Sequence, residues 1–267
     1  MKNRLIQSKG IILSKKKQNE FDDFLTIYSP SLGKINAVSK GSRKITSHFC
    51  GHLEPLNICQ FAVYKSEYRF TITQAVVEKN FKNIRKNLKT SMLAMLVLEI
   101  FQKSTSIEEN IEGETLFSLL EKTLDTLSNS QFPLLAIEKF KLELLRNVGA
   151  LPDITSCSIC QKRWKLENTI SLTEENHLLC EVCKEAPLLS RKIDFNIIKL
   201  MHFLLTENLE KQKLVLSLPE EKKLQSFTNI FLYNYLNKEI FAEKIIDQIA
   251  ELSNLHYQFS SQPSSSL

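Results

Sequence analysis

The hydrophobic pattern of the chain changes its period near residue 79. Before this point, short runs rich in β-branched and aromatic residues alternate with turn residues, which is typical of short β-strands. After it, apolar residues recur every three or four positions, as on the buried face of an amphipathic helix. The pattern therefore predicts a β-rich part followed by a helical part, an α+β fold class. The expected strands span residues 5–13, 24–29, 34–39, 56–64 and 68–77.

Five short strands at the start of the chain predict a small closed barrel, because closure removes the exposed sheet edges that pair with other chains. The segment from Pro30 to Gly33 predicts a tight hairpin turn between the second and third strands. We expect an OB-fold over residues 1–79. The pattern alone leaves an SH3-like barrel as an alternative.

The helical part is expected over residues 80–253, and Pro133 and Gly149 predict the start and end of one of its helices. Residues 195–205 and a segment that begins at Ser217 predict two more. The serine-rich residues 254–267 predict a disordered tail. One predicted apolar stripe joins Phe81, Ile84, Leu88, Met92, Met95 and Leu96. Another joins Leu116, Leu119, Leu120, Thr123, Leu124 and Leu127.

Charge divides the chain at almost the same place. Residues 1–90 contain 17 Lys and Arg against six Asp and Glu, whereas residues 91–267 contain 18 against 24. The net charge of +5 is therefore the difference between a basic part of +11 and an acidic part of −6. Such asymmetry indicates a polyanion-binding module joined to a part with another task, although a lysine-rich surface can also serve solubility alone.

The basic residues of the barrel fall into clusters, which is what contact with DNA phosphates requires. Four lie beyond the predicted hairpin turn and three at the end of the first strand. The expected DNA contacts are Lys15, Lys16, Lys17, Lys34, Lys40, Arg43 and Lys44. A second group, predicted to share one helix face, either extends this track or is a solvated surface: Lys82, Arg85, Lys86 and Lys89.

Aromatic residues of the barrel are candidates for stacking on bases. Strand alternation directs at least half of them into the barrel core, so none is assigned to DNA. The candidates are Phe49, Phe61, Tyr64, Tyr68 and Phe70.

Two cysteine pairs, Cys157-x2-Cys160 and Cys180-x2-Cys183, have the spacing of a structural zinc site. Each short turn directs two thiolates to one point, and two such turns complete a tetrahedral shell of four sulfurs with no open position. We expect a zinc finger over residues 156–187. The alternative is two unrelated pairs of reduced cysteines.

Other metal chemistry finds weaker support in the sequence. A zinc deaminase needs an H-x-E or C-x-E segment upstream of P-C-x-x-C. The segment His52-Leu53-Glu54 lies far from the cysteine pairs, and neither pair follows a proline. His48, Cys50 and His52, with Cys59 beyond, are a less favoured second metal site.

Several classes of protein are excluded or disfavoured. The six glycines form neither G-x-x-x-x-G-K nor G-x-G-x-x-G, which argues against a P-loop ATPase and a Rossmann dehydrogenase. The longest apolar run, residues 92–98, is too short to cross a bilayer. The first 17 residues lack the apolar core of a signal peptide. We therefore expect a cytoplasmic protein whose cysteines are reduced or bound to metal.

An ordered series of short motifs resembles the bacterial RecO family of recombination and repair proteins. It begins with Gly10-Ile11-Ile12-Leu13, Gly33-Lys34 and Lys40-Gly41-Ser42-Arg43 and continues with Leu53-Glu54-Pro55-Leu56. The central part follows F-x-L-x-L-L-x-x-x-G-x-x-P and leads into the four cysteines: Phe140, Leu142, Leu144, Leu145, Gly149 and Pro152.

The resemblance implies an N-terminal OB-fold, a helical domain and an embedded zinc finger, in a protein that is not an enzyme. It implies binding of single- and double-stranded DNA without sequence specificity and annealing of complementary strands. It also implies that the protein, with RecR, promotes RecA loading onto strands coated by single-strand-binding protein (SSB), whose acidic C-terminal tail it contacts, in the RecF pathway at the nucleoid.

Two readings of the residues compete with this one. The first is a zinc-stabilised scaffold that binds acidic proteins and does not bind DNA. The second is a zinc-dependent hydrolase, which a closed four-sulfur shell disfavours.

Overall fold

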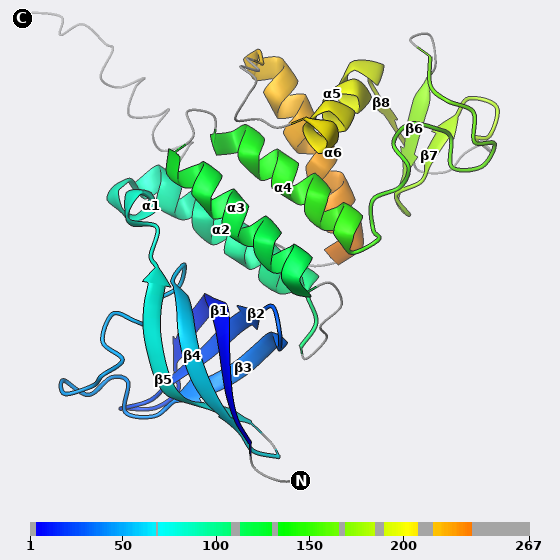
Figure 1. Cartoon of the computed structure of the whole chain (residues 1–267). Helices are drawn as coiled ribbons and strands as arrows, with labels where there is room; N and C mark the ends of the chain where they lie inside the picture. Colours follow the sequence, from blue (N-terminus) through cyan, green and yellow to red (C-terminus); the bar gives the residue numbers. More distant parts are fainter. Residues whose placement is uncertain are drawn as a thin grey trace, which may run out of the picture.

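A computed structural model describes residues 4–67, 69–107, 113–129, 133–165, 169–184, 190–207 and 216–236 of the chain (Figure 1). A barrel lies at the N-terminal end, helices follow it, and a small sheet lies at the far side of the helices. The predicted α+β class is confirmed. Three predicted parts lie wholly or partly outside the described residues. They are the tail (residues 254–267), the end of the helical part (from residue 237) and the end of the finger (residues 185–187).

Five strands close the barrel in the order β1-β2-β3-β5-β4. Only the β3–β5 pair is parallel, and all other pairs in the barrel are antiparallel. This five-stranded Greek-key arrangement is an OB-fold rather than an SH3-like barrel. The strands are β1 (Arg4–Lys17), β2 (Asp23–Ser29), β3 (Gly33–Ser39), β4 (Ile58–Lys65) and β5 (Phe70–Lys79).

The long first strand closes the barrel because it pairs on both sides. Its first half pairs with β4, and its second half pairs with β2 from Ile11 onward, with a register shift between Ile12 and Ser14. Gly10 lies at a crowded point of the barrel wall. A Cβ there would lie 2.7 Å from the Phe61 ring and 2.8 Å from the Tyr28 carbonyl oxygen, which only glycine avoids.

Six helices are described: α1 (Lys82–Lys86), α2 (Leu88–Ser104), α3 (Gly113–Asn129), α4 (Pro133–Asn147), α5 (Phe195–Thr206) and α6 (Leu218–Leu236). The predicted starts at Pro133 and near Ser217 are confirmed, as is the buried stripe of α3. Gly149 has a φ of +71° just beyond α4, which suits the helix end predicted there. None of the helices in the described part is long and apolar enough to span a bilayer.

The predicted apolar stripe that starts at Phe81 is wrong at Leu88 and Met95, whereas Phe81, Ile84 and Leu96 are buried as predicted. Asn87 has an extended backbone, and its side chain accepts a hydrogen bond from Thr90 N–H, so it ends α1 and caps α2. The interruption rotates the following helix, which leaves Leu88 72% exposed and Met95 42% exposed. The predicted single helix face for Lys82, Arg85, Lys86 and Lys89 is wrong for the same reason, because the first three lie on α1 and the last on α2.

The small sheet is built of β6 (Ile170–Thr173), β7 (Leu178–Cys180) and β8 (Ser190–Ile193), in the order β7-β6-β8. Ile170, Leu172 and Leu178 belong to the same hydrophobic core as the helices. The finger is therefore embedded in the helical part rather than suspended from it.

The barrel and the helices also share a core. Ile11, Leu13 and Tyr28 of the barrel belong to the cluster that fills the helical part. The Tyr28 ring meets the Phe101 ring of α2 edge-on, with centroids 4.7 Å apart. This packing fixes the barrel against the end of α2.

A buried ion pair joins α4 to α6. Lys141 and Glu138 are 1% and 2% exposed, and Lys141 Nζ lies 3.0 Å from Glu138 Oε1. From α6, Asn229 Oδ1 accepts from Lys141 Nζ at 2.6 Å, and the Thr228 hydroxyl donates to Glu138. Both buried charges are thus paired and hydrogen-bonded, which burial of charge requires.

Replacement of Lys141 by Met should lower the free energy of unfolding by about 3–5 kcal/mol, because it leaves the Glu138 carboxylate buried without its cation. Urea denaturation measures this change. The double variant Glu138→Leu/Lys141→Met should recover most of the loss, and Lys122→Met on the exposed face of α3 should change stability by less than about 0.5 kcal/mol. A loss below about 1 kcal/mol for Lys141→Met would contradict the role given to the pair.

Candidate nucleic-acid interface and metal centre

The four predicted metal ligands meet at one point of the finger. The sulfur atoms of Cys157, Cys160, Cys180 and Cys183 all lie within 4.8 Å of one another. The Cys160 and Cys180 sulfurs are 3.8 Å apart. Zinc–sulfur bonds of about 2.3 Å in a tetrahedron place the sulfurs about 3.8 Å from one another. The donor set therefore fits a tetrahedral metal ion, and the predicted four-cysteine cluster is confirmed.

Backbone hydrogen bonds shape the two cysteine turns. Gln161 N–H donates to the Cys157 carbonyl at 3.0 Å, and Cys183 N–H donates to the Cys180 carbonyl at 3.1 Å. Ser158 N–H donates to the first carbonyl of β7 at 2.8 Å, which joins the first turn to the strand that carries the second pair. The four thiols are thus brought together by the fold of the finger.

The pKa values of the clustered thiols also indicate that the cluster suits a bound cation. Burial opposes ionisation of Cys157, but backbone N–H groups of Cys160, Cys180 and Ile159 donate to its sulfur and lower its pKa to about 6. Hydrogen bonds with Cys160 and Cys180 raise the pKa of Cys183 to about 12. Four thiols this close cannot all ionise alone, and a bound divalent cation removes that repulsion.

The finger is tied to α6 through the turn between β6 and β7. Asn176, with a φ of +62°, donates from its side-chain amide to the Phe231 carbonyl at 3.0 Å. Asn234 donates to the Asn176 side-chain oxygen at 2.8 Å. These contacts anchor the finger to α6 of the helical domain.

The second metal site considered near His48 does not form in the described part of the chain. The Cys59 thiol is buried and donates to the His52 carbonyl at 3.2 Å, while His52 Nδ1 accepts from Val77 N–H at 3.3 Å. Among the described residues, the four-cysteine cluster is the one group of three or more side chains placed to hold a metal.

The basic residues of β1 and of the loop after β3 lie at the same end of the barrel. In the strand register, Lys17 lies opposite Asp23 at the start of β2, and Asp23 lies opposite Ser39 at the end of β3. The loop that carries Lys40, Arg43 and Lys44 then packs on the β1–β2 loop, where Arg43 N–H donates to the Phe21 carbonyl at 3.0 Å. The sequence clusters predicted for DNA are therefore neighbours in space.

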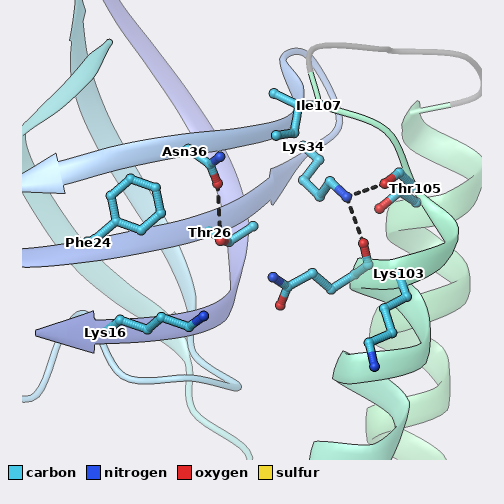
Figure 2. A pocket seen from close by; sticks show the side chains of 9 residues that line it. Lys16, Phe24, Thr26, Lys34, Asn36, Lys103, Thr105 and Ile107 are labelled. Carbon is cyan, nitrogen blue, oxygen red and sulfur yellow. Dashed lines mark hydrogen bonds between the residues drawn. The ribbon is translucent and has the colours of Figure 1, made fainter. Parts of the chain in front are cut away.

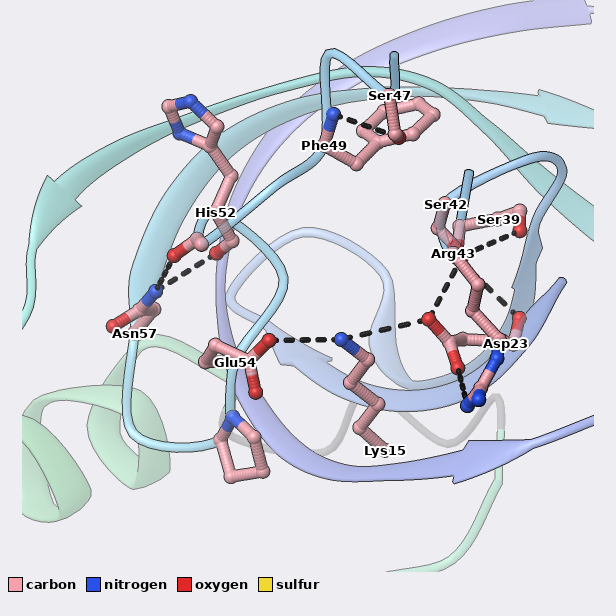
Figure 3. Close-up of polar contacts among 12 residues, drawn as sticks. Lys15, Asp23, Ser39, Ser42, Arg43, Ser47, Phe49, His52, Glu54 and Asn57 are labelled. Atoms are coloured by element: carbon pink, nitrogen blue, oxygen red, sulfur yellow. Dashed lines mark hydrogen bonds and ion pairs between the residues drawn. The ribbon is translucent and has the colours of Figure 1, made fainter. Parts of the chain in front are cut away.

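Asp23 holds this arrangement together (Figure 3). Its side chain is 1% exposed and accepts from the Ser42 hydroxyl at 2.8 Å. Lys15 Nζ lies 3.4 Å from one carboxylate oxygen, and an Arg43 guanidinium nitrogen lies 3.6 Å from the other. Lys15 also binds Glu54 at 2.8 Å. Partial burial opposes the charge on Lys15, but these two carboxylates outweigh it and raise the pKa of Lys15.

Four of the predicted contact residues extend outward from this network. Lys16, Lys17, Lys40 and Lys44 are exposed and form no ion pair with any residue that the structure describes. Phe21 lies beside them, 45% exposed, with Lys44 Nζ 5.4 Å from the centre of its ring. Phe21 was missed from sequence because it falls in a loop between strands; the run Lys15–Lys17 that precedes it is the signal that could have marked it.

The structure places Lys34 elsewhere. Its side chain is 8% exposed, and its amine donates to the Gln102 carbonyl at 2.6 Å and to the Thr105 carbonyl at the end of α2. Lysine at this point satisfies carbonyls that the helix end leaves without partners. The geometry therefore gives Lys34 a structural role between barrel and helices.

Arg85 likewise joins two parts of the chain. Its guanidinium donates to the Pro55 carbonyl at 2.7 Å and to Asn57 Oδ1 at 2.9 Å. The other members of the second basic group, Lys82, Lys86 and Lys89, are exposed.

Most of the aromatic candidates for base stacking lie inside. Phe61 and Phe70 belong to the barrel core, and Phe49 packs against it. Tyr64 is exposed on β4, and Tyr68 lies outside the described residues. The decision to assign none of them to DNA is consistent with this burial.

Comparison with known proteins matches nearly the whole chain to one family. The description "Recombination protein O N terminal" matches residues 1–81, and "Recombination protein O C terminal" matches residues 85–242. The DNA repair protein RecO of Alkaliphilus metalliredigens is 30% identical over 239 residues, which cover 88% of this chain and 90% of that protein. The RecO of Dehalococcoides mccartyi is 30% identical over 200 residues, covering 74% and 77%. The RecO of Desulforamulus reducens is 26% identical over 249 residues, which cover 92% of this chain and 95% of that protein.

The six thiols should react with a thiol reagent at pH 8 in three classes. Cys50 is exposed and should react at once, whereas burial raises the pKa of Cys59 to about 12 and should keep it unreactive until the chain unfolds. The four clustered cysteines should react only after a chelator removes their metal ion.

Timed reaction with a chromogenic disulfide, before and after chelation, counts these classes. Replacement of Cys50 by Ser should abolish the fast phase in the untreated chain. Five fast thiols without chelator would mean that no metal ion holds the cluster.

Proposed function

Because the chain belongs to the RecO family of DNA repair proteins, we propose that it binds single- and double-stranded DNA without sequence specificity and anneals complementary strands. With RecR, it promotes RecA loading onto SSB-coated single strands in the RecF pathway, and it acts in the cytoplasm at the nucleoid. The single observation that carries the DNA-binding part is the group of exposed lysines at one end of the OB-fold barrel.

This end of the barrel has the properties of a phosphate-binding surface. Lys16, Lys17, Lys40 and Lys44 are exposed, and none of their amines lies within 4.0 Å of a carboxylate among the described residues, although Lys40 and Lys44 are near enough to Asp22 to help lower its pKa. Lysine contacts to phosphates supply affinity and position without reading bases. Phe21 adds a ring on which any base can stack. Such a surface lowers the phosphate repulsion that opposes the approach of two complementary strands, which is what annealing requires.

We propose a narrower set of DNA contacts than the sequence alone suggests. Lys15 and Arg43 are paired with Asp23, so their charge is partly neutralised at short range. Lys34 and Arg85 bind backbone carbonyls. Lys82, Lys86 and Lys89 remain candidates for an extension of the track, because they are exposed near the junction of barrel and helices.

We assign zinc to the cysteine cluster. Four thiolates in a tetrahedral arrangement favour zinc over harder cations. Cys157, Cys160, Cys180 and Cys183 would fill all four positions, so the ion would stabilise the finger and leave no site for a reacting water. This supports a protein that acts by binding rather than by catalysis.

The helical domain is the proposed site of protein contacts, including RecR and the acidic SSB tail. A groove of about 820 Å³ lies between α3, α4 and the end of α5. Its lining combines apolar side chains such as Phe140 and Leu205 with three cations and three acids: Lys122, Lys139, Arg146, Glu114, Glu143 and Glu207. Lys122 is exposed and suits an acidic peptide, whereas Lys139 binds the last carbonyls of α5.

The triple variant Lys17→Gln/Lys40→Gln/Lys44→Gln should weaken binding of a fluorescent oligonucleotide at least about tenfold at moderate salt. These lysines are chosen because they make no ion pair with a described residue, so the fold should survive. If the unmodified chain neutralises about five phosphates of a single strand, log K should fall against log salt with a slope of roughly −3 to −4, and the variant should reduce that slope by about 2.

A matched control removes the same charge from the helical domain and finger. Lys122→Gln/Lys192→Gln/Lys222→Gln should leave DNA affinity within about twofold, because only long-range attraction changes. Equal losses in both variants would place the DNA site elsewhere. A salt-independent affinity, or no binding by the unmodified chain, would instead favour a zinc-stabilised scaffold that does not bind DNA.

A further inference from the structure

A pocket of about 310 Å³ lies where the outer face of the barrel meets the end of α2 (Figure 2). One wall consists of outward-facing residues of β1, β2 and β3, among them Lys16, Phe24 and Asn36. Their neighbours along the strands, Leu25 and Ile35, point into the barrel core. The outer face of strands 2 and 3 is the surface on which OB-folds bind oligonucleotides.

The opposite wall is held in place by Lys34. Its amine binds carbonyls of Gln102 and Thr105, and Ile107 forms a β-bridge beside it. The end of α2 is thereby fixed against β3, and Gln102 and Lys103 face the strands across the pocket. The pocket is therefore part of the packed junction between barrel and helices.

The chemistry of the lining suits a nucleotide. Phe24 is half-buried and presents its ring to the pocket without belonging to either hydrophobic core. The Thr26 hydroxyl donates to Asn36 Oδ1 at 3.1 Å, which orients the Asn36 NH₂ group as a donor for the carbonyl oxygens and ring nitrogens of bases. Lys16 supplies an exposed cation at the same place.

The volume of the pocket and its position beside the basic end of the barrel indicate which ligand it can hold. A volume of about 310 Å³ is near the lower limit of small-molecule sites and suits one nucleotide rather than a base pair. Lys16 lines the pocket and lies one residue before Lys17, at the end of β1. Successive strand residues point to opposite faces, so a DNA strand bound at the basic end would reach the pocket by passing around the end of β1. A base can enter only when it is unpaired.

We infer that this pocket holds one unpaired nucleotide of a DNA strand, with its base against the Phe24 ring and the Asn36 amide and its phosphate near Lys16. This inference rests on the proposed DNA binding and adds to it a preference for single strands over duplexes. Single strands gain a contact that duplexes cannot make, and the bound base must leave the pocket when the complementary strand pairs with it.

The test compares two fluorescent 12-nucleotide strands, one of thymidines and one of abasic sites, bound by the full chain and by Phe24→Ala. Stacking of a base on an aromatic side chain contributes to the binding free energy, so Phe24→Ala should weaken thymidine-strand binding at least about fivefold. Abasic-strand binding should change less than about twofold, because the phosphate contacts remain. Phe24→Tyr, which keeps the ring, should bind like the unmodified chain, whereas Phe24→Leu, which keeps only the bulk, should bind like Phe24→Ala.

A matched control is Tyr64→Ala, which removes an exposed aromatic of β4 outside the pocket and should leave both affinities within about twofold. Equal weakening of both strands by Phe24→Ala, or no weakening of either, would overturn the pocket as a nucleotide site while the DNA-binding function stands. Failure of the unmodified chain to bind either strand would contradict the proposed function itself.

Discussion

The carboxylate of Asp23, buried at the start of β2, is the constraint on which the basic end of the barrel depends. A buried charge is tolerated only when cations and hydrogen-bond donors compensate it. Here Lys15 and Arg43 supply the charge and Ser42 supplies a donor, so the end of β1 and the loop after β3 must both approach β2. The remaining lysines of the same two segments are then left pointing outward.

The same division between inward and outward cations recurs across the molecule. Lys34 binds the end of α2, Lys139 binds the end of α5, and Lys141 is paired inside the helical core. Lys79 lies 2.6 Å from Asp125 of α3. The charge of +11 in residues 1–90 therefore overstates what is free to attract DNA, because part of it stabilises the junctions between elements.

Local patterns predicted the elements well, and tertiary contacts explain what they missed. The barrel strands, the stripe of α3 and the four cysteines each follow from spacing within a short stretch of chain. The end of α1 at Asn87 depends on a side-chain cap that periodicity does not register. Sequence could not separate Lys34 from Lys40, because the difference lies in whether α2 covers the side chain. Phe24 and its pocket could not be found at all without the position of α2.

The central claim is that a charged, sequence-neutral surface brings strands together. Its most direct test follows annealing of two complementary fluorescently labelled strands coated with SSB, in the presence and absence of the purified chain. The account predicts faster annealing that declines as salt rises and is lost when Lys17, Lys40 and Lys44 are replaced by Gln. Annealing at the uncatalysed rate with the unmodified, metal-bound chain would contradict it.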